Sequence, residues 1–346
     1  MLGIPTVVDR LVQQAINQVL TSIYENQFSK TNYGFRPRRG CHDALRGAQR
    51  IINEGYIYVV DLDLERFFDT MSHSKLIEIL SHTIKDGRVV SLIHKYLRSG
   101  VMNKGLFEAS EEGTPQGGPL SPLLSNIMLN ELDKELERRG LPFVRYADDS
   151  MIFCKSKRAA MRVKDSITRF IENVLYLKVN KEKTVVSYVR GVKYLGYSFY
   201  VTKGKCQLMV HPKSKAKMKA RLKELTSRSN GWGYAMRKQL LKEYIKGWVG
   251  YYHLANMKRL LLETDEWLRR RIRMCIWKAW KKAKTKVANL IRCGINKYQA
   301  YEGGNTRKGY WRTADSHILH RAISNEHLCR AGYATLMGSY LEWHPK

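Results

Sequence analysis

Residues 144–153 read VRYADDSMIF and place two adjacent aspartates, Asp148 and Asp149, inside an alternating apolar pattern. Alternation of this kind over a short stretch predicts a β-hairpin with the aspartates at its tip. Aspartate tolerates turn geometry, so such a pair taken alone is more often structural than functional. Two neighbouring carboxylates nevertheless repel each other unless a cation lies between them or one is protonated. The pair is therefore a candidate cation site if other acidic residues lie near it.

Two more aspartates follow an apolar stretch upstream. Residues 56–62 predict a buried strand, and Asp61 and Asp63 share one face of it because side chains alternate along a strand. Proteins hold Mg²⁺ with one or two carboxylates, water and substrate phosphates. Two such ions, about 4 Å apart, can activate an attacking oxygen and stabilise a leaving one in phosphoryl transfer. The acidic residues therefore predict a site for two Mg²⁺ ions.

Helical and strand patterns alternate up to about residue 205. A Gly/Pro-rich loop ends at Ser121, which we expect to be the N-cap of a helix with Pro122 at its first position and Gly140 at its end. Residues 192–201 predict a further strand. This order predicts an α+β fold with helices packed on one face of an antiparallel sheet.

The second part of the chain is a polycation. Residues 201–346 hold 32 of the 61 basic residues and 9 of the 31 acidic ones, a net charge of +23. Helical patterns at 213–228, 237–263 and 266–284 predict a basic bundle after a boundary near residue 205. A basic face of this density attracts nucleic acid phosphates, and an anionic membrane surface is the competing target.

Several protein classes are excluded by what the sequence lacks. No apolar run approaches 18 residues and no signal peptide pattern opens the chain, so we expect a soluble, intracellular (cytoplasmic) protein with no membrane partner. The six cysteines are scattered without a CxxC pair, which argues against a zinc ribbon or a disulfide framework.

Five ordered motifs carry a family resemblance. VDLDLERFFD (60–69), GTPQGGPLSPLLSNI (113–127), YADD (146–149), LKVNKEKT (177–184) and VKYLGYSF (192–199) resemble the sequential palm motifs of a reverse transcriptase. YGFRPRRG (33–40) resembles the preceding fingers motif, and LKELTSRSN, YIKGWVGYY and EWLRRRIRMCIWKAWKK resemble a maturase or thumb domain. The sequence is most similar to bacterial group II intron reverse transcriptase/maturases.

This resemblance implies an architecture. Residues 1–205 would form partial fingers and the palm of a right-hand polymerase, and residues 206–346 an all-α basic thumb/maturase (domain X) region that binds RNA. The chain opens at MLGIPTVVDR, midway through the first fingers motif of the family, and no HNH nuclease module is visible at its carboxy end. Full-length relatives carry upstream a hairpin whose Lys and Arg side chains grip the nucleotide triphosphate. Because these charge-assisted contacts stabilise the transition state, we expect polymerase activity to depend on them.

The resemblance also implies residue roles in catalysis. Asp63, Asp148 and Asp149 match the metal-binding aspartates, with Asp61 as the alternative to Asp63. Phe68, five residues after Asp63, matches an aromatic steric gate, and a bulky ring beneath the sugar excludes the 2′-hydroxyl of a ribonucleotide. Without the neighbouring aspartate, Phe68 would be read as a core aromatic.

Further roles carry over from the remaining motifs. Gln116 and Gly117 match the nucleotide-binding loop, and Lys183 matches a lysine that protonates departing pyrophosphate, although a solvated surface lysine is an equal alternative. Leu195 and Gly196 match the primer grip. Candidate RNA-binding residues are Arg36, Arg38 and Arg39 on the template side and Arg269, Arg270, Arg271 and Arg273 in the basic region, each of which could instead be a solvated charge.

Together these features predict an RNA-directed DNA polymerase that also binds its group II intron RNA to assist splicing and mobility. Its partners would be intron RNA, an RNA template with a DNA primer, and deoxynucleotides. The alternative is an RNA-binding maturase or decayed remnant without polymerase activity. A reverse transcriptase of phage defence or diversity generation would lack the maturase-like helices, so residues 213–282 argue against that class.

Overall fold

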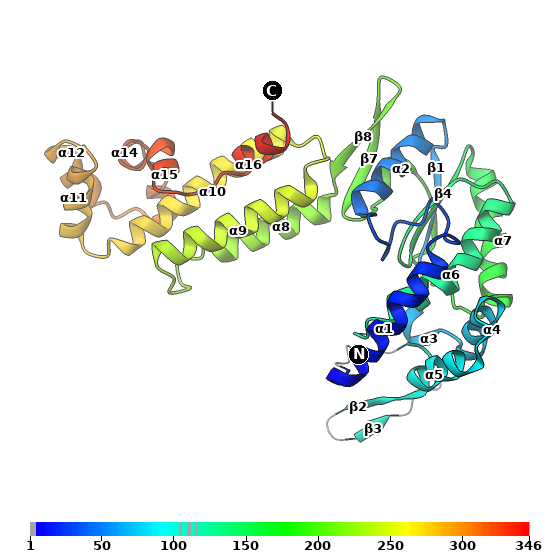
Figure 1. Ribbon diagram of the computed structural model, residues 1–346. Helices are drawn as coiled ribbons and strands as arrows, with labels where there is room; N and C mark the ends of the chain where they lie inside the picture. The colour runs from blue at the N-terminus through cyan, green and yellow to red at the C-terminus, as the bar shows by residue number, and fades with distance from the viewer. Residues whose placement is uncertain (1–4, 104–105, 109–111, 115–116, 346) are drawn as a thin grey trace. The chain divides into compact units, whose positions relative to one another are not determined.

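The computed structural model of the chain describes residues 5–103, 106–108, 112–114 and 117–345. Gln116, a predicted nucleotide-binding residue, lies outside this set. The chain divides into two compact units, residues 1–207 and 208–346 (Figure 1). The first unit combines a β-sheet with helices, and the second consists almost entirely of helices. The predicted α+β fold followed by a helical region is therefore confirmed.

An antiparallel sheet of four strands forms the centre of the first unit. Its strand order is β4 (Phe143–Tyr146), β5 (Asp149–Cys154), β1 (Tyr58–Leu62) and β6 (Val185–Tyr188). β1 is a central strand, because it pairs with β5 on one side and β6 on the other. One face of the sheet, carrying Val60, Leu62 and Ile152, joins the main hydrophobic core. The opposite face carries Asp61 and Asp149 beside buried apolar residues such as Met151 and Phe153.

Helices complete that core. α6 (Ser121–Arg138) buries an apolar stripe, Leu124, Ile127, Met128, Leu132 and Leu136, and α7 (Lys157–Asn173) packs against β1, β5 and β6. The other elements of this unit are α1 (Val7–Tyr24), α2 (Cys41–Asn53), α3 (Phe67–Thr70), α4 (His73–Thr83), α5 (Gly87–Arg98), β2 (Val101–Asn103) and β3 (Leu106–Glu108). β7 (Tyr197–Thr202) pairs with β8 (Lys205–Val210), and the division between the units falls inside β8.

Two predicted element boundaries of the first unit were wrong, the start of α6 and the extent of the strand at residues 192–201. Leu120, not Ser121, is the N-cap of α6, because the Leu120 carbonyl already accepts from the amides of Leu123 and Leu124. Gly140, with a φ of 62°, ends the helix as predicted. Residues 192–201 are not one strand, since Tyr194 and Tyr197 close a tight turn before β7 begins.

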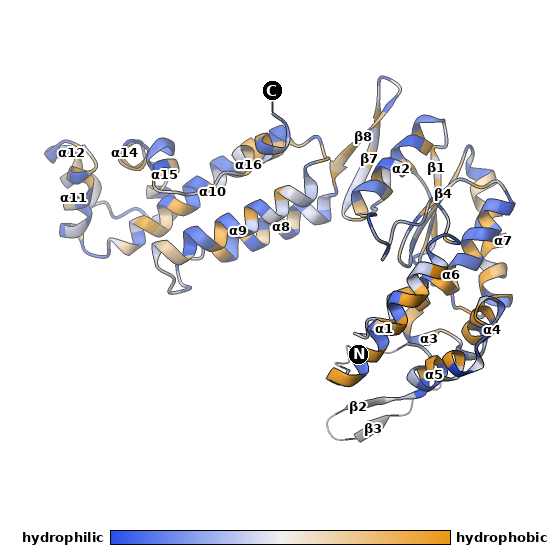
Figure 2. Cartoon of the chain, viewed as in Figure 1, coloured by the Kyte–Doolittle hydropathy of each residue, from blue (hydrophilic) through white to orange (hydrophobic). Residues whose placement is uncertain are grey.

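The second unit is built on three long helices, α8 (Pro212–Leu225), α9 (Tyr234–Tyr252) and α10 (Lys258–Ala279). The pattern at 237–263 predicted one helix, whereas the chain turns between α9 and α10. Apolar residues alternate with polar ones around each helix (Figure 2), and many of the apolar ones, among them Leu222, Leu241 and Ile272, are buried. Six short helices follow: α11 (Ala283–Arg292), α12 (Lys297–Gly304), α13 (Tyr310–Thr313), α14 (His317–Ala322), α15 (Asn325–Arg330) and α16 (Leu336–Trp343).

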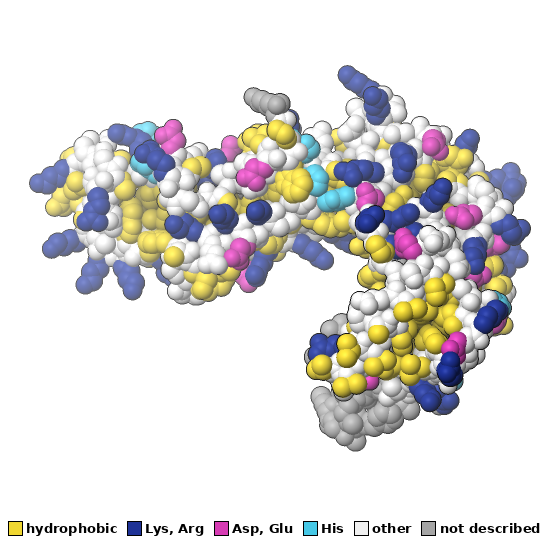
Figure 3. Space-filling model, viewed as in Figure 1, with side chains coloured by type: hydrophobic (Ala, Val, Ile, Leu, Met, Phe, Trp, Pro, Cys, Tyr) yellow, Lys and Arg dark blue, Asp and Glu magenta, His cyan; other side chains and the backbone are white. Residues whose placement is uncertain are grey.

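The surface of the second unit carries the predicted positive charge. Lys and Arg side chains are spread over its helices (Figure 3). The six cysteines of the chain are unpaired. Among the described residues, no helix is both long enough and apolar enough to cross a membrane.

Candidate active site

The pairing of β1 with β5 brings the predicted acidic residues together. Leu62 lies opposite Ser150 in this antiparallel ladder, so Asp63, the next residue, follows toward Asp149. Asp61 is two residues before Asp63 and shares its face of the sheet. Three carboxylates from two distant segments therefore lie on the face opposite the hydrophobic core.

The fourth carboxylate, Asp148, lies in the turn between β4 and β5. Tyr146 pairs with Asp149, so only Ala147 and Asp148 connect the two strands. Ala147 has a φ of 57°, a left-handed conformation that residues with a Cβ seldom adopt. Turns of this hand match the twist of hairpin strands. The turn thus presents Asp148 beside Asp149 at the tip of the hairpin, as the alternation predicted.

The carboxylates of this face repel one another. Loss of hydration, followed by the charges of Asp148 and Asp63, raises the pKa of Asp149. Loss of hydration, followed by the charges of Asp149 and Asp63, raises the pKa of Asp61 to about 6. Lys193 opposes both shifts but does not cancel them. Both carboxyl groups are therefore harder to ionise here than in water, through burial first and through their acidic neighbours second.

Lys183 forms an ion pair with Asp63, with its Nζ 3.8 Å from Asp63 Oδ1. The segment that carries Lys183 is hydrogen-bonded to the backbone of Asp63. The amide of Asn180 donates to the Asp63 carbonyl at 2.9 Å, and the hydroxyl of Thr184 also donates to that carbonyl at 3.3 Å. The sequence did not single out Asn180 and Thr184, although an Asn whose side chain caps the amides two and three residues on is a common turn pattern.

The donor set fits a divalent cation that substrate helps to hold. Among the described residues, no group of three or more His, Cys, Asp and Glu side chains is placed to hold a metal ion without other ligands. Mg²⁺ needs no such group, because water and substrate phosphates supply most of its ligands. The side chain of Asp63 is 37% exposed, which leaves it open to such a ligand. The carboxylate oxygens of Asp63 and its neighbours are of the donor type that a divalent cation prefers.

Phe68 lies in α3, five residues beyond Asp63, and its ring packs edge-on against Phe67 with centroids 5.2 Å apart. Its carbonyl accepts from the amide of Thr114 at 2.6 Å, so α3 is tied to the Gly-rich loop. A Cβ on Gly113 would lie 2.7 Å from that same carbonyl oxygen. Gly117 has a φ of 115°, a conformation that favours glycine. The structure brings Phe68 and this loop together, and their part in nucleotide binding stays a prediction.

The predicted primer-grip residues form the tight turn before β7. Leu195 and Gly196 have φ values of 48° and 81°, and the amides of Tyr194 and Tyr197 each donate to the other residue's carbonyl. Tyr194 is buried, and its hydroxyl has no hydrogen-bond partner in the described part of the chain. Burial, followed by the charge of Asp149, raises the pKa of Tyr194, which places this turn next to the acidic face.

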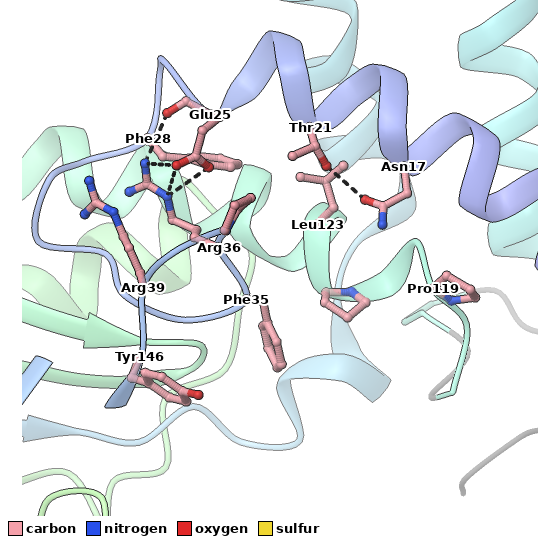
Figure 4. Close-up of a pocket in the computed structure, with 12 residues that line it drawn as sticks. Asn17, Thr21, Glu25, Phe28, Phe35, Arg36, Arg39, Pro119, Leu123 and Tyr146 are labelled. Carbon is pink, nitrogen blue, oxygen red and sulfur yellow. Dashed lines mark hydrogen bonds and ion pairs between the residues drawn. The ribbon is translucent and has the colours of Figure 1, made fainter. Parts of the chain in front are cut away.

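The arginines of the YGFRPRRG loop differ in what they contact. Arg36 is 7% exposed, and its guanidinium is occupied by Glu25 and by the carbonyls of Ser29 and Asn32 (Figure 4). It braces the loop, so its side chain is not free to contact a phosphate. Arg39 donates to the Asn32 and Lys30 carbonyls.

Arg38, by contrast, is exposed and makes no hydrogen bond or ion pair within the described residues. Arg36 and Arg39 line a pocket of about 400 Å³ together with Phe35 and Tyr146 (Figure 4). The pocket joins the loop to the residue that precedes the aspartate turn. Because Arg38 is exposed and has no such partner among the described residues, it is the arginine of this loop that is available to a ligand.

The arginines of α10 divide in the same way. Arg273 is buried and donates to the Ile323 carbonyl and to Asn325 Oδ1, both at 2.8 Å. Arg271 donates to the hydroxyl and carbonyl of Thr226. These two side chains connect helices of the unit, which an apolar pattern alone could not predict.

Arg270 and Arg269 lie closer to solvent. The guanidinium of Arg270 lies 4.0 Å from the ring centroid of Trp311 and pairs with Asp315 at 2.9 Å. Arg269 makes no hydrogen bond or ion pair in the part of the chain that the structure describes. It is the arginine of this cluster that remains open to a nucleic acid phosphate.

Comparisons with known proteins agree with this division of the chain. Residues 1–199 match the family "Reverse transcriptase (RNA-dependent DNA polymerase)", and residues 215–294 match "Group II intron, maturase-specific domain". The helical region after residue 208 thus contains the maturase-specific match.

The chain is also similar to individual proteins. The chain is 33% identical to Protein YkfC of Escherichia coli over 57% of this chain and 62% of that protein. It is 32% identical to the group II intron-encoded protein LtrA of Lactococcus lactis over 58% of this chain and 44% of that protein. Among solved structures, apo telomerase from Candida tropicalis is similar at 13% identity and a TM-score of 0.47, over 90% of this chain and 59% of that chain. The chain spans about half the length of these curated relatives. It belongs to the reverse transcriptase family, and specifically to the group II intron reverse transcriptases that carry a maturase-specific domain.

Proposed function

We propose that this chain is an RNA-directed DNA polymerase of a group II intron that also binds its intron RNA to assist splicing and mobility. The observation that supports the polymerase proposal is the pairing of β1 with β5, which brings Asp61 and Asp63 toward Asp149 and the turn that carries Asp148. The proximity of Asp149 to Asp148 and Asp63, whose charges add to burial in raising its pKa, supports it, because neighbouring carboxylates favour a bound cation. Substrates would be deoxynucleotides, an RNA template and a DNA primer, and the proposed location is the bacterial cytoplasm.

Within this proposal, Asp63 and Asp148 hold two Mg²⁺ ions and Asp149 supports them. When bound, such ions activate a primer 3′-hydroxyl and stabilise the departing pyrophosphate oxygens. Lys183, close to Asp63 and exposed, donates a proton to pyrophosphate. Phe68 excludes ribonucleotides, Gln116 and Gly117 shape the nucleotide pocket, and Leu195 and Gly196 position the primer end.

The polymerase part is tested by primer extension on a poly(rA)/oligo(dT) template with Mg²⁺. Asp148→Ala should abolish extension while intron RNA binding survives, because the RNA-binding charge lies mainly after residue 200. Robust extension by the wild-type chain would eliminate the alternative of a protein that only binds RNA. Equal loss of extension and RNA binding in a folded Asp148→Ala protein would contradict the proposed division of labour.

A pair of variants decides whether Asp61 or Asp63 binds metal. Asp63→Asn should abolish extension, because Asp63 continues the register toward Asp149 and lies beside Lys183. Asp61→Asn should retain measurable extension. The reverse result would transfer the metal-binding role to Asp61.

The RNA-binding part rests on the net charge of +23 in residues 201–346. Arg269 and the exposed lysines of α8 are the proposed phosphate contacts, since Arg271 and Arg273 are used inside the unit. Each contact releases counterions, so binding should weaken steeply with salt. Intron RNA affinity measured at several salt concentrations tests this, and an affinity independent of salt would contradict it.

A further inference from the structure

A buried ion pair lies directly beneath the aspartate turn. Arg145, in β4, and Asp133, in α6, are both fully buried, and Arg145 Nε donates to Asp133 Oδ1 at 2.8 Å. Arg145 pairs with Ser150, on the face of the sheet opposite Asp149, so its side chain points away from the acidic face and toward α6. Burial raises the pKa of Asp133, while the charge and hydrogen bonds of Arg145 oppose that rise.

The same guanidinium holds the turn itself. Arg145 Nη1 donates to the Ala147 carbonyl at 3.0 Å and to Asn126 Oδ1 at 3.0 Å. Ala147 has the left-handed φ of 57°, which persists in a residue with a Cβ only where its surroundings fix it. The forked guanidinium offers donors in a fixed plane, so its bonds to Asp133 and Asn126 set the position of the Ala147 carbonyl.

Asn126 extends this contact to the YGFRPRRG loop. Its side-chain amide donates to the Gly34 carbonyl at 2.8 Å, and its Oδ1 accepts from Asn32 Nδ2 at 3.2 Å. The loop backbone also pairs with the edge of β4, because the Tyr33 amide donates to the Arg145 carbonyl at 2.8 Å. One buried network thus joins α6, this loop and the aspartate turn.

We propose that Arg145, Asp133 and Asn126 are positioning residues that hold Asp148 and Asp149 in the geometry needed to bind divalent metal. The inference rests on the proposed polymerase function. A buried ion pair contributes little to folding stability by itself, because apolar side chains of similar volume in its place give an equal or higher stability. Its directional hydrogen bonds instead fix one conformation of a strained turn, as outer-shell partners do for metal ligands.

Two readouts test the proposal, and one does not depend on activity. In the first, Fe²⁺ replaces Mg²⁺, and ascorbate with peroxide then makes the bound ion cut the backbone beside it. The amount of fragment that ends near residue 63 is compared with the amount that ends near residue 148. In the second, primer extension is measured against Mg²⁺ concentration. Arg145→Lys keeps a positive charge for Asp133 but loses the planar guanidinium that donates to Asp133, Asn126 and Ala147 at once. It should reduce the cut near 148 relative to that near 63 and raise the half-maximal Mg²⁺ concentration about tenfold.

Arg237→Lys is the matched control. Arg237 is a buried arginine of the helical unit that donates to Asn230 Oδ1 at 3.0 Å. Its variant should lose thermal stability without changing the cleavage ratio or the Mg²⁺ midpoint. If Arg145→Lys fails to fold, Asn126→Ser, which removes the link to Gly34, gives the deciding measurement.

The proposal is overturned by a folded Arg145→Lys or Asn126→Ser protein with wild-type cleavage ratio and Mg²⁺ midpoint. An equal shift in Arg237→Lys overturns it too. A wild-type chain that is cut near both aspartates but extends no primer would contradict the polymerase function, and the cleavage ratio would still decide on the network. A wild-type chain that is not cut at all would overturn the network, because no metal would be positioned.

Discussion

Gly34 and Ala147 are in backbone contact. A Cβ built on Gly34 would collide with the Ala147 amide nitrogen and lie 2.9 Å from the Ala147 Cα. The loop that resembles a fingers motif therefore packs its backbone directly against the aspartate turn, and only glycine permits that approach. A change in the backbone of the loop at Gly34 would therefore displace the backbone of the turn.

Gly34→Ala should displace the turn and impair catalysis more than stability. Overpacking costs about 1–3 kcal/mol of folding free energy, whereas a shift of about 1 Å in a catalytic group can cost roughly 100-fold in rate. Thermal denaturation and single-turnover primer extension measure the two effects. Gly87→Ala is the control, because a Cβ there has no neighbour within 4 Å. A folded Gly34→Ala protein with wild-type extension would show that the turn tolerates the shift.

His73 should make the first unit less stable in mild acid. Burial lowers the pKa of His73 from its ordinary 6.5, and the hydrogen bond to the Gly113 carbonyl only partly opposes this. Below pH 6.5 the unfolded chain therefore binds more protons at this residue than the folded chain, and stability falls as pH falls. Urea denaturation at pH 7.5 and 5.5 measures the difference. In His73→Gln, which does not titrate, that difference should shrink, and an unchanged difference would contradict the assignment.

The acidic face could be predicted from the sequence because its signals are local. Alternation along residues 56–62 and 144–153 predicts which side chains share a face, and a hairpin tip predicts where the aspartate pair lies. Lys183 is predicted to lie near this site only through the family resemblance. Its position beside Asp63 depends on the turn from Asn180 to Thr184, which docks on a strand more than a hundred residues earlier in the chain.

The network under the turn could not be predicted, because its signals are long-range. Arg145 alternates with apolar neighbours in a hairpin and would be expected to face solvent, but α6 covers that face and the loop at residues 31–33 covers the strand edge. One clue was present in α6. Asn126, Asn130 and Asp133 follow helical spacing and are all buried, and buried polar side chains on one helical stripe require partners.

Phe68→Val should relax discrimination against ribonucleotides. A smaller side chain leaves room for a 2′-hydroxyl, so the ratio of deoxynucleotide to ribonucleotide incorporation should fall about 10- to 100-fold. Steady-state incorporation of dTTP and UTP on a poly(rA) template measures the ratio. Phe67→Leu is the matched control, since Phe67 is 2% exposed and should affect stability rather than discrimination. Equal changes of the ratio in both variants would assign Phe68 to the core.

Arg269 and Arg273, on the same helix, should give opposite results. Arg273 is buried against Ile323 and Asn325, so Arg273→Gln should lower the stability of the second unit by about 1–3 kcal/mol. Arg269 makes no such contacts, so Arg269→Gln should change stability by less than about 0.5 kcal/mol. If Arg269 contacts a phosphate, its loss should weaken intron RNA binding and reduce the salt slope of log affinity by about 1. Filter binding at several salt concentrations, well below both melting temperatures, measures this. A reduced slope for Arg273→Gln with none for Arg269→Gln would mean that the buried arginine becomes exposed when RNA binds.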